Sequence, residues 1–303
     1  MKKATSSGAR TNGAAPQPNL DSALKLVMQM MAIPGMSGQE GKVVKFIRQR
    51  LEKAGAAADS LAVDNTPDKS PLGGETGGLI LKMPGTLRGK RRLLMAHIDT
   101  VPLCVGCDPV RRNGYVESAN PATGLGADDR AGATVLLNTA LEILRRGLPH
   151  PPLTFFWPVQ EEVGLHGARY VPLGLLGKPS LAFNWDGSDA DKVVVGATGA
   201  YRLQITIRGL ASHAGGAPEK GVSAIGIAGL AIAELQRGGW HGAVNHDGNY
   251  GTSNIGVFQG GAATNVVTDR VYIRAEARSH DPKFRLRIAE TIEQAFRKAA
   301  EEV

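Results

Sequence analysis

Hydrophobic positions recur with two different periods over the first two thirds of the chain, and these periods predict alternating helices and strands. Apolar residues three and four positions apart predict two helices within residues 21–55, separated by "IPGMSGQE", and a long helix in "GADDRAGATVLLNTALEILRRG" that ends at Gly147. Short apolar runs predict strands in "GGLILKMPG", "KRRLLMAHIDTV", "PLTFFWPV" and "SLAFNWDG". This alternation is typical of a layered α/β fold with a largely parallel sheet.

The pattern changes near Gly196, where polar and apolar residues begin to alternate with period two in "AYRLQITIRG". A helix in "GVSAIGIAGLAIAELQ", strands in "GTSNIGVFQGG" and "RVYIRAEARSH", and a last helix in "PKFRLRIAETIEQAFRKAAEEV" follow. This β-α-β-β-α order is a split βαβ unit without its closing strand. We therefore predict a flexible tail over residues 1–20, one domain over 21–196 and a second over 197–303.

Composition places the chain among ordinary globular proteins, since 42% of its 303 residues are hydrophobic and 21% are charged. No apolar run approaches the ~20 residues that cross a bilayer, and no apolar segment follows the basic N-terminus as in a secretory signal. The net charge of +7 could indicate nucleic-acid binding, but the basic residues are dispersed and aromatics make up only 5%. We expect neither a nucleic-acid nor a membrane partner.

Cys104 and Cys107 are the only cysteines, and they form one C-x-x-C pair. So few thiols indicate a reducing compartment, so we expect a cytoplasmic protein. Such a pair can be a redox motif or half of a zinc site. Because "CVGCDPV" is typical of a loop rather than a helix start, a structural or incidental pair is favoured.

Ionisable residues follow the predicted strands, at or just after their C-terminal ends. In "LLMAHIDTVP", His97 and Asp99 share one face, because side chains alternate along a strand. In an open α/β sheet this edge is where ligands bind. The remaining ionisable residues predicted at this edge are Asp128, Asp129, Glu161, Glu162 and Asp186.

This set of carboxylates predicts a metal site. Taken alone, each has an ordinary explanation: the Asp128–Asp129 pair suits a helix N-terminus, and the others suit turns. Together at one edge they would raise each other's pKa unless a cation neutralised them. One divalent cation, or two that share a bridging carboxylate, explains the whole set. A histidine with carboxylates suits zinc, with cobalt or manganese as alternatives.

Four motifs, "MAHIDTVP", "GLGADDRAG", "PVQEEVGLHGA" and "NWDG", resemble successive signatures of the dinuclear zinc peptidases related to peptidase T and glutamate carboxypeptidase. The resemblance extends from about residue 21 to the end of the chain. It implies a zinc-peptidase-like α/β catalytic domain interrupted by an inserted α+β lid domain of ferredoxin-like type. It also implies two Zn²⁺ per active site and a homodimer formed through the lid.

The resemblance also implies a role for each matching residue. His97 would bind the first metal, with Asp99 as the partner that orients its ring. Asp128 would bridge the two metals, and Asp129 would shape the turn behind it. Glu161 would be the general base that takes a proton from the attacking water. Two further carboxylates would complete the sites, Glu162 for the second metal and Asp186 for the first.

Three residues of the lid match family positions as well. His213, in "GLASHAGGAPEKG", resembles the histidine that stabilises the oxyanion, often across a dimer interface. Asn265 and Arg278 resemble lid residues that contact substrate, and Arg278 suits a substrate carboxylate. The implied function is zinc-dependent hydrolysis of an amide bond in small peptides by a peptidase T-like aminopeptidase. A deacylase or a carboxypeptidase of the same family is the alternative.

Relatives continue beyond the lid and supply a last histidine for the second metal, whereas this sequence stops at Val303. His241, His246 and His280 lie within the lid and are poor substitutes by position. The second metal would then have only Asp128 and Glu162 as ligands. A rival hypothesis is therefore a truncated, catalytically silent chain that binds at most one metal or a partner.

Overall fold

The computed structural model describes residues 16–187, 189 and 191–303. The chain divides into two compact units, the first ending at residue 190 and the second covering residues 191–303. Most of the tail predicted over residues 1–20 lies outside the described residues, and its last residue, Leu20, already begins a helix. The domain boundary predicted after residue 196 falls in the irregular segment that precedes the first strand of the second unit.

The first unit is built on a five-stranded sheet with the order β1-β2-β6-β3-β7. Strand β3 pairs in parallel with β6 and β7, whereas β2 pairs antiparallel with β1 and β6. Its elements are α1 (Leu20–Met31), α2 (Gly41–Lys53), β1 (Leu61–Val63), α3 (Thr66–Lys69), β2 (Leu79–Met83), β3 (Arg92–Met95), β4 (Pro109–Arg112), β5 (Tyr115–Ser118), α4 (Ala127–Arg146), β6 (Leu153–Trp157), α5 (His166–Tyr170), α6 (Leu173–Leu176) and β7 (Leu181–Asn184).

The prediction of a largely parallel sheet is therefore wrong for half of the pairings. A parallel pair needs a crossover of a dozen or more residues, usually a helix that covers the sheet. The connection from β1 to β2, residues 64–78, is long enough for a crossover but forms only the four-residue helix α3, and these two strands pair antiparallel. The two-stranded β4–β5 sheet, which the apolar pattern did not indicate, is a separate antiparallel hairpin.

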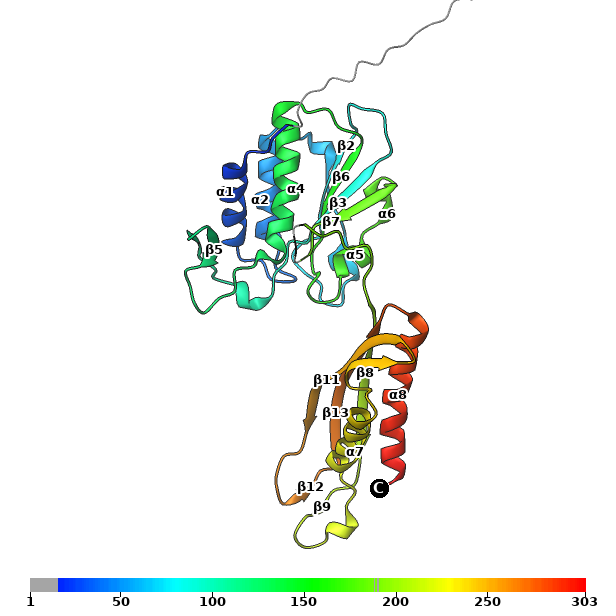
Figure 1. Cartoon of the computed structure of the whole chain (residues 1–303). Helices are drawn as coiled ribbons and strands as arrows, with labels where there is room; N and C mark the ends of the chain where they lie inside the picture. The colour runs from blue at the N-terminus through cyan, green and yellow to red at the C-terminus, as the bar shows by residue number, and fades with distance from the viewer. Residues whose placement is uncertain (1–15, 188, 190) are drawn as a thin grey trace, which may run out of the picture. The chain divides into compact units, whose positions relative to one another are not determined.

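Helices cover both faces of this sheet. Figure 1 shows α1, α2 and α4 side by side on one face, and the main hydrophobic core joins them to β2 and β6. A smaller cluster on the other face packs Leu176 of α6 against β2, β3 and β6. Because both faces are covered, all five residues of β6 are buried, and four of them, all but Thr154, are apolar. Trp157 at its end donates a hydrogen bond to Ala133 O of α4 at 3.1 Å.

The second unit is an antiparallel sheet with the order β10-β11-β13-β8. Helices α7 and α8 pack together, and their buried residues form one core with the sheet (Figure 1). Its elements are β8 (Gly199–Arg208), β9 (Ser212–His213), α7 (Ala224–Arg237), β10 (Gly242–His246), β11 (Asn249–Gly260), β12 (Val266–Val267), β13 (Arg270–Ser279) and α8 (Pro282–Glu301).

The predicted β-α-β-β-α order of this unit omits β10, which pairs with β11 as a hairpin. Its loop is Asp247–Gly248, and both residues have positive φ, 54° and 76°. An Asp-Gly dipeptide is a strong sequence signal for such a two-residue turn. Strand β10 could therefore have been found from its turn, although its own residues, "GAVNH", carry little apolar pattern.

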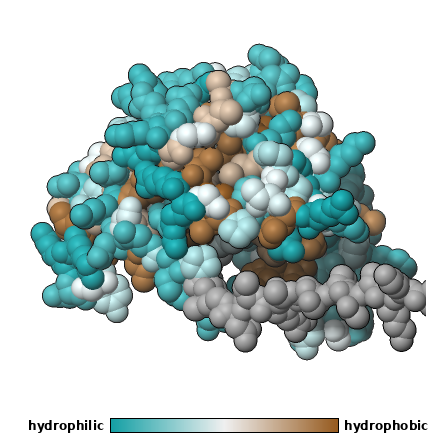
Figure 2. Space-filling view, turned by 90° about the horizontal axis from the view of Figure 1, so that it is seen from above, coloured by the Kyte–Doolittle hydropathy of each residue, from teal (hydrophilic) through white to brown (hydrophobic). Residues whose placement is uncertain are grey.

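No helix among the residues that the structure describes is long and apolar enough to cross a membrane. The face drawn in Figure 2 is mostly hydrophilic, with hydrophobic residues scattered between the polar ones. Scattered apolar residues are normal on a protein surface.

Candidate metal centre

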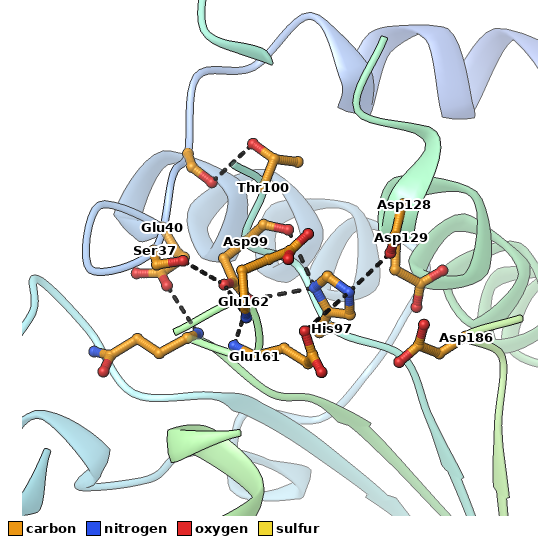
Figure 3. Close-up of polar contacts among 12 residues, drawn as sticks. Ser37, Glu40, His97, Asp99, Thr100, Asp128, Asp129, Glu161, Glu162 and Asp186 are labelled. Carbon is orange, nitrogen blue, oxygen red and sulfur yellow. Dashed lines mark hydrogen bonds and ion pairs between the residues drawn. The ribbon is translucent and has the colours of Figure 1, made fainter. Parts of the chain in front are cut away.

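The three parallel strands of the first unit bring the predicted ionisable residues to one edge of the sheet. His97 follows β3, Glu161 and Glu162 follow β6, and Asp186 follows β7. Parallel strands end at the same edge, so these side chains converge, as Figure 3 shows. The extended segment that carries His97 and Asp99 begins after β3 has ended at Met95, so both residues lie in a loop rather than within the strand.

His97 is the centre of this arrangement. Its side chain is 2% exposed, and its Nε2 lies 3.1 Å from Asp128 Oδ1 and 3.9 Å from Glu161 Oε2. On the opposite side of the ring, Nδ1 lies 3.3 Å from Asp99 Oδ1. Burial alone would lower the pKa of His97, but the hydrogen bond and the negative charge of Asp99 outweigh burial and raise that pKa to about 9.

Asp99 joins three separate loops at this centre. It is fully buried, and its carboxylate accepts hydrogen bonds from the Ser37 hydroxyl at 2.7 Å and from two backbone N–H groups. These belong to Glu161, at 2.9 Å, and Glu162, at 3.2 Å. Burial opposes ionisation, yet the His97 and Ser37 hydrogen bonds keep the pKa of Asp99 below its usual value. Asp99 therefore contacts the ring of His97 and also holds the backbone of the adjacent glutamates.

Asp128 and Asp129 lie where α4 begins. Both have non-helical backbone angles, and the peptide bond between them is cis. Asp128 is exposed, whereas Asp129 is buried and accepts a hydrogen bond from Gly132 N at 3.1 Å. The turn-shaping role of Asp129 stays a prediction. Its second oxygen, Oδ2, is buried without a hydrogen-bond partner among the described residues.

The ionisable residues form two overlapping groups that share His97. One group is His97, Asp128 and Glu162, and the other is His97, Asp129 and Asp186; the ligand atoms of each lie within 4.8 Å of one another. Asp128 and Asp186 do not fall within the same group, although both were predicted as ligands of the first metal. Asp129 stands with Asp186 instead. The bridging role of Asp128 thus stays a prediction.

The charge balance of the site fits a metal ion. Burial raises the pKa of Asp129 to about 8, and the negative charges of Asp186 and Asp128 add to that shift. Burial likewise raises the pKa of Glu161 and of Glu162. Several carboxylates that lower each other's acidity, with one buried oxygen unpartnered, are the donor set that a divalent cation neutralises. A histidine nitrogen with carboxylate oxygens suits a transition metal such as zinc.

Sequence reasoning missed the residues behind the site. Ser37, Glu40 and Arg130 are held close to Asp99 and the Gln160–Glu162 segment by hydrogen bonds or charge. Ser37 stands 62 positions from Asp99, so no local spacing could connect them. One signal for these residues was present in the sequence. The segment "MSGQE", which contains Ser37 and Glu40, is a polar cluster at the place where only a break between two helices was predicted.

Cys104 and Cys107 take no part in either group of candidate ligands. Both thiols are free, and Cys107 is buried and donates to Leu125 O at 3.4 Å. Burial raises the pKa of the Cys104 thiol. These features favour the structural alternative over the redox one, because reactive thiols have a lowered pKa.

In the second unit, two of the three predicted lid residues are neighbours. His213 of β9 pairs with Val266 of β12, and Ala214 N donates to the carbonyl of Asn265 at 2.9 Å. His213 is exposed, and its Nδ1 accepts a hydrogen bond from Gly215 N at 3.2 Å. The neutral ring then carries its proton on Nε2, where it can be donated.

Arg278 lies elsewhere in this unit. It stands near the end of β13, whereas β9 and β12 lie by the beginning of that strand (Figure 1). Its guanidinium forms a two-pronged ion pair with Glu276, at 2.9 and 3.0 Å. Among the lid histidines, His246 stacks on Trp240 with ring centroids 3.9 Å apart, and His241 contacts Gln236.

Comparison with known proteins agrees with this geometry. Residues 79–196 match the model of peptidase family M28, and residues 195–303 match that of the peptidase dimerisation domain. A tripeptidase from Staphylococcus aureus is 32% identical with a TM-score of 0.83, and the match covers 94% of this chain and 73% of that one. The aminopeptidase PepT from Bacillus cereus is 31% identical, with a TM-score of 0.79 and the same coverage.

Carboxypeptidase G2 from Pseudomonas is 35% identical over 143 residues, which cover 45% of this chain and 33% of that protein. The resemblance seen in the sequence motifs is thus confirmed over most of the chain, and so is the predicted combination of a catalytic α/β domain with a dimerisation domain. The chain belongs to the peptidase T family of metallopeptidases, which are peptide-bond hydrolases.

Proposed function

We propose that this protein is a zinc-dependent aminopeptidase that removes N-terminal residues from short peptides, tripeptides above all. The observation that carries the proposal is the sharing of one buried histidine, His97, by two groups of carboxylates at a single sheet edge. The similarity to a tripeptidase and to an aminopeptidase supports this choice of substrate.

The residues that would hold metal are His97, Asp128, Asp129, Glu162 and Asp186. When bound there, a divalent zinc ion would supply a Lewis acid that polarises the peptide carbonyl and lowers the pKa of water. His97 is already oriented for this task, because Asp99 holds its Nδ1 and leaves Nε2 facing the carboxylates. Cobalt and manganese remain alternatives to zinc.

Glu161 is the proposed general base. Its carboxylate is partly exposed, which lets water and substrate reach it, and burial raises its pKa above that of an ordinary glutamate. A carboxylate with a raised pKa is a better proton acceptor at neutral pH. Because Asp99 fixes the backbone N–H of Glu161, the base starts from a defined position.

The lid residues contribute to substrate binding in this proposal. His213 presents Nε2–H to solvent, suited to a developing oxyanion, and Asn265 lies beside it. Arg278 would bind the carboxylate of the peptide. Residues 195–303 match a dimerisation domain, so we also propose a homodimer through this unit. A cytoplasmic location stays a prediction from the two free thiols.

A carboxypeptidase or deacylase is the second candidate, favoured by the similarity to carboxypeptidase G2. To decide between the two, the protein is incubated with zinc and a tripeptide of three different residues, and the amino acid that is released first is identified. Release of the N-terminal residue supports the aminopeptidase. Release of the C-terminal residue, or activity on N-acyl amino acids alone, supports the alternative. H97A is the control for chemistry at this site, and no turnover by the metal-loaded protein would support the silent-chain hypothesis.

A further inference from the structure

Glu40 is a buried acid that the proposed mechanism does not use. It is fully buried just before α2, and its Oε1 accepts hydrogen bonds from Gly38 N at 2.9 Å and Gln160 N at 3.0 Å. Its Oε2 makes no hydrogen bond to any residue that the structure describes. A buried polar atom without a partner costs free energy, and the two hydrogen bonds to the other oxygen offset part of that cost.

Gln160 is the residue through which Glu40 reaches the site. It is fully buried and has a φ of 56°, a left-handed backbone that side-chain-bearing residues rarely adopt. Its side chain is tied to the facing loop, since Nε2 donates to Gly73 O at 2.6 Å and Oε1 accepts from the Ser70 hydroxyl. The backbone of Gln160 is therefore held from two sides, by Glu40 and by the residues around Gly73.

Three consecutive backbone N–H groups donate hydrogen bonds to two buried carboxylates. Gln160 N donates to Glu40, and the next two, Glu161 N and Glu162 N, donate to the two oxygens of Asp99. Figure 3 shows Glu40 and Asp99 on the same side of this segment. The first bond therefore holds the residue directly before the two glutamates.

A buried cation accompanies the two acids. Arg130 is 1% exposed, and its guanidinium donates to Met30 O at 2.9 Å and Gly35 O at 3.2 Å. Burial lowers the pKa of Arg130 to about 10, while the charges of Asp99 and Glu40 oppose that shift, so it stays charged at neutral pH. Burial raises the pKa of Glu40 to about 7. A glutamine at this position would thus resemble the protonated form of Glu40 in shape and in charge.

We propose that Glu40 is a positioning residue for the Glu161–Glu162 pair, acting through the backbone N–H of Gln160. The consequence for catalysis rests on the function proposed above, but the positioning itself does not. Glu40 is not one of the candidate ligand residues. We expect Glu40 to affect the orientation of two side chains, the general base Glu161 and the metal ligand Glu162.

Hydrogen exchange of single backbone amides tests this positioning without metal or substrate. The variants are E40A, E40D, whose side chain is one methylene shorter, and E40Q, which keeps an oxygen at Oε1. D64A is the matched control, because Asp64 is also a buried acid with one oxygen bonded to a backbone N–H, that of Thr66 at 2.8 Å, and one unpartnered. The amides of β6 serve as the internal reference for wider unfolding.

In E40A and E40D we expect exchange of the Glu161 and Glu162 amides to accelerate about tenfold beyond the β6 reference. In E40Q and D64A it should stay within about twofold of the unmodified protein. Acceleration confined to Gly38 and Gln160 would overturn the proposal, because Glu40 would then serve only its direct partners. Equal acceleration in E40Q and E40A would overturn it as well. If E40A does not fold, the contrast between E40D and E40Q decides.

Two further readouts connect positioning to function. The visible spectrum of bound Co²⁺ should change in E40A and not in D64A. For tripeptide hydrolysis, E40A should lower kcat about tenfold to a hundredfold with KM nearly unchanged, as expected when a reacting group is misplaced. An unmodified protein that hydrolyses no peptide would contradict the proposed function alone, since the exchange data would still decide the role of Glu40.

Discussion

The carboxylate of Asp99 accepts the backbone N–H of Glu161 at 2.9 Å, while it also contacts the ring of His97. One buried side chain therefore sets both the orientation of the shared metal-site histidine and the position of the proposed base. The arrangement couples β3 to β6 beyond the point where their ladder hydrogen bonds end. Loss of Asp99 should accordingly disturb metal binding and catalysis together.

Replacing Asp99 should weaken metal binding. D99A leaves the His97 ring and two backbone N–H groups without their acceptor, so we expect the affinity for zinc to fall about 10- to 100-fold, typical of such supporting residues. Competition with a chromophoric chelator measures this. The control is S37A, which removes only the 2.7 Å hydroxyl contact to Asp99 and should cost clearly less. Equal affinities for D99A and S37A would contradict the role of Asp99.

The adjacent glutamates should separate into one that serves chemistry and one that serves metal binding. E161Q should retain its metal while kcat falls about 10²- to 10⁴-fold, because amide oxygen is a poor proton acceptor. E162Q should lose metal, because Glu162 stands with His97 and Asp128 in one candidate group. Elemental analysis after dialysis without chelator, combined with tripeptide turnover, distinguishes the two variants. Metal loss in E161Q with full retention in E162Q would reverse the assignment.

Glu40 should make stability depend on pH. Its pKa is raised from 4.5 to about 7 in the folded state, so the folded chain keeps a proton that the unfolded chain releases near pH 4.5. Between these values the folded state binds more protons, and the free energy of unfolding therefore falls as pH rises, by about 3 kcal/mol in total. E40Q cannot lose that proton, so it should gain stability relative to the unmodified protein across this window.

Urea unfolding in chelator at pH 4.5 and pH 8 measures this difference, and the chelator keeps metal from contributing. If the free energies of unfolding of E40Q and of the unmodified protein differ by the same amount at both pH values, Glu40 ionises as an ordinary glutamate.

Arg278 should affect substrate affinity rather than turnover. Glu276 occupies the Nε–Nη2 edge of the guanidinium at 2.9 and 3.0 Å, which fixes the plane of the forked group and leaves its Nη1–Nη2 edge to receive a substrate carboxylate. R278K keeps the charge but loses the fork, so we expect KM for a tripeptide to rise about tenfold with little change in kcat. A tripeptide amide, which has no terminal carboxylate, is the matched control. An equal rise in KM for the amide would assign Arg278 a role other than carboxylate binding.

Much of the first unit could be predicted because its signals are local. The apolar period of three and four positions marked α1, α2 and α4, and Gly147 marked the end of α4. Continuous apolar runs marked β2, β6 and the strand before His97, because helices bury both faces of the sheet. The pairing direction of β1 and β2 could not be predicted this way, since it depends on whether the connection between them forms a helix long enough to cover the sheet, and α3 has only four residues.

The sequence by itself determined which residues could do chemistry, since histidine and carboxylates recur just beyond the ends of strands. Only the tertiary structure decided which of them stand together. Asp129, rather than Asp128, forms one candidate ligand group with His97 and Asp186. Hydrogen bonds across 62 and 120 positions bring Ser37 and Glu40 behind the site. Local periodicity cannot reveal such contacts, because the two partners lie far apart in the sequence. A buried charge needs partners, and only the folded chain brings them to it.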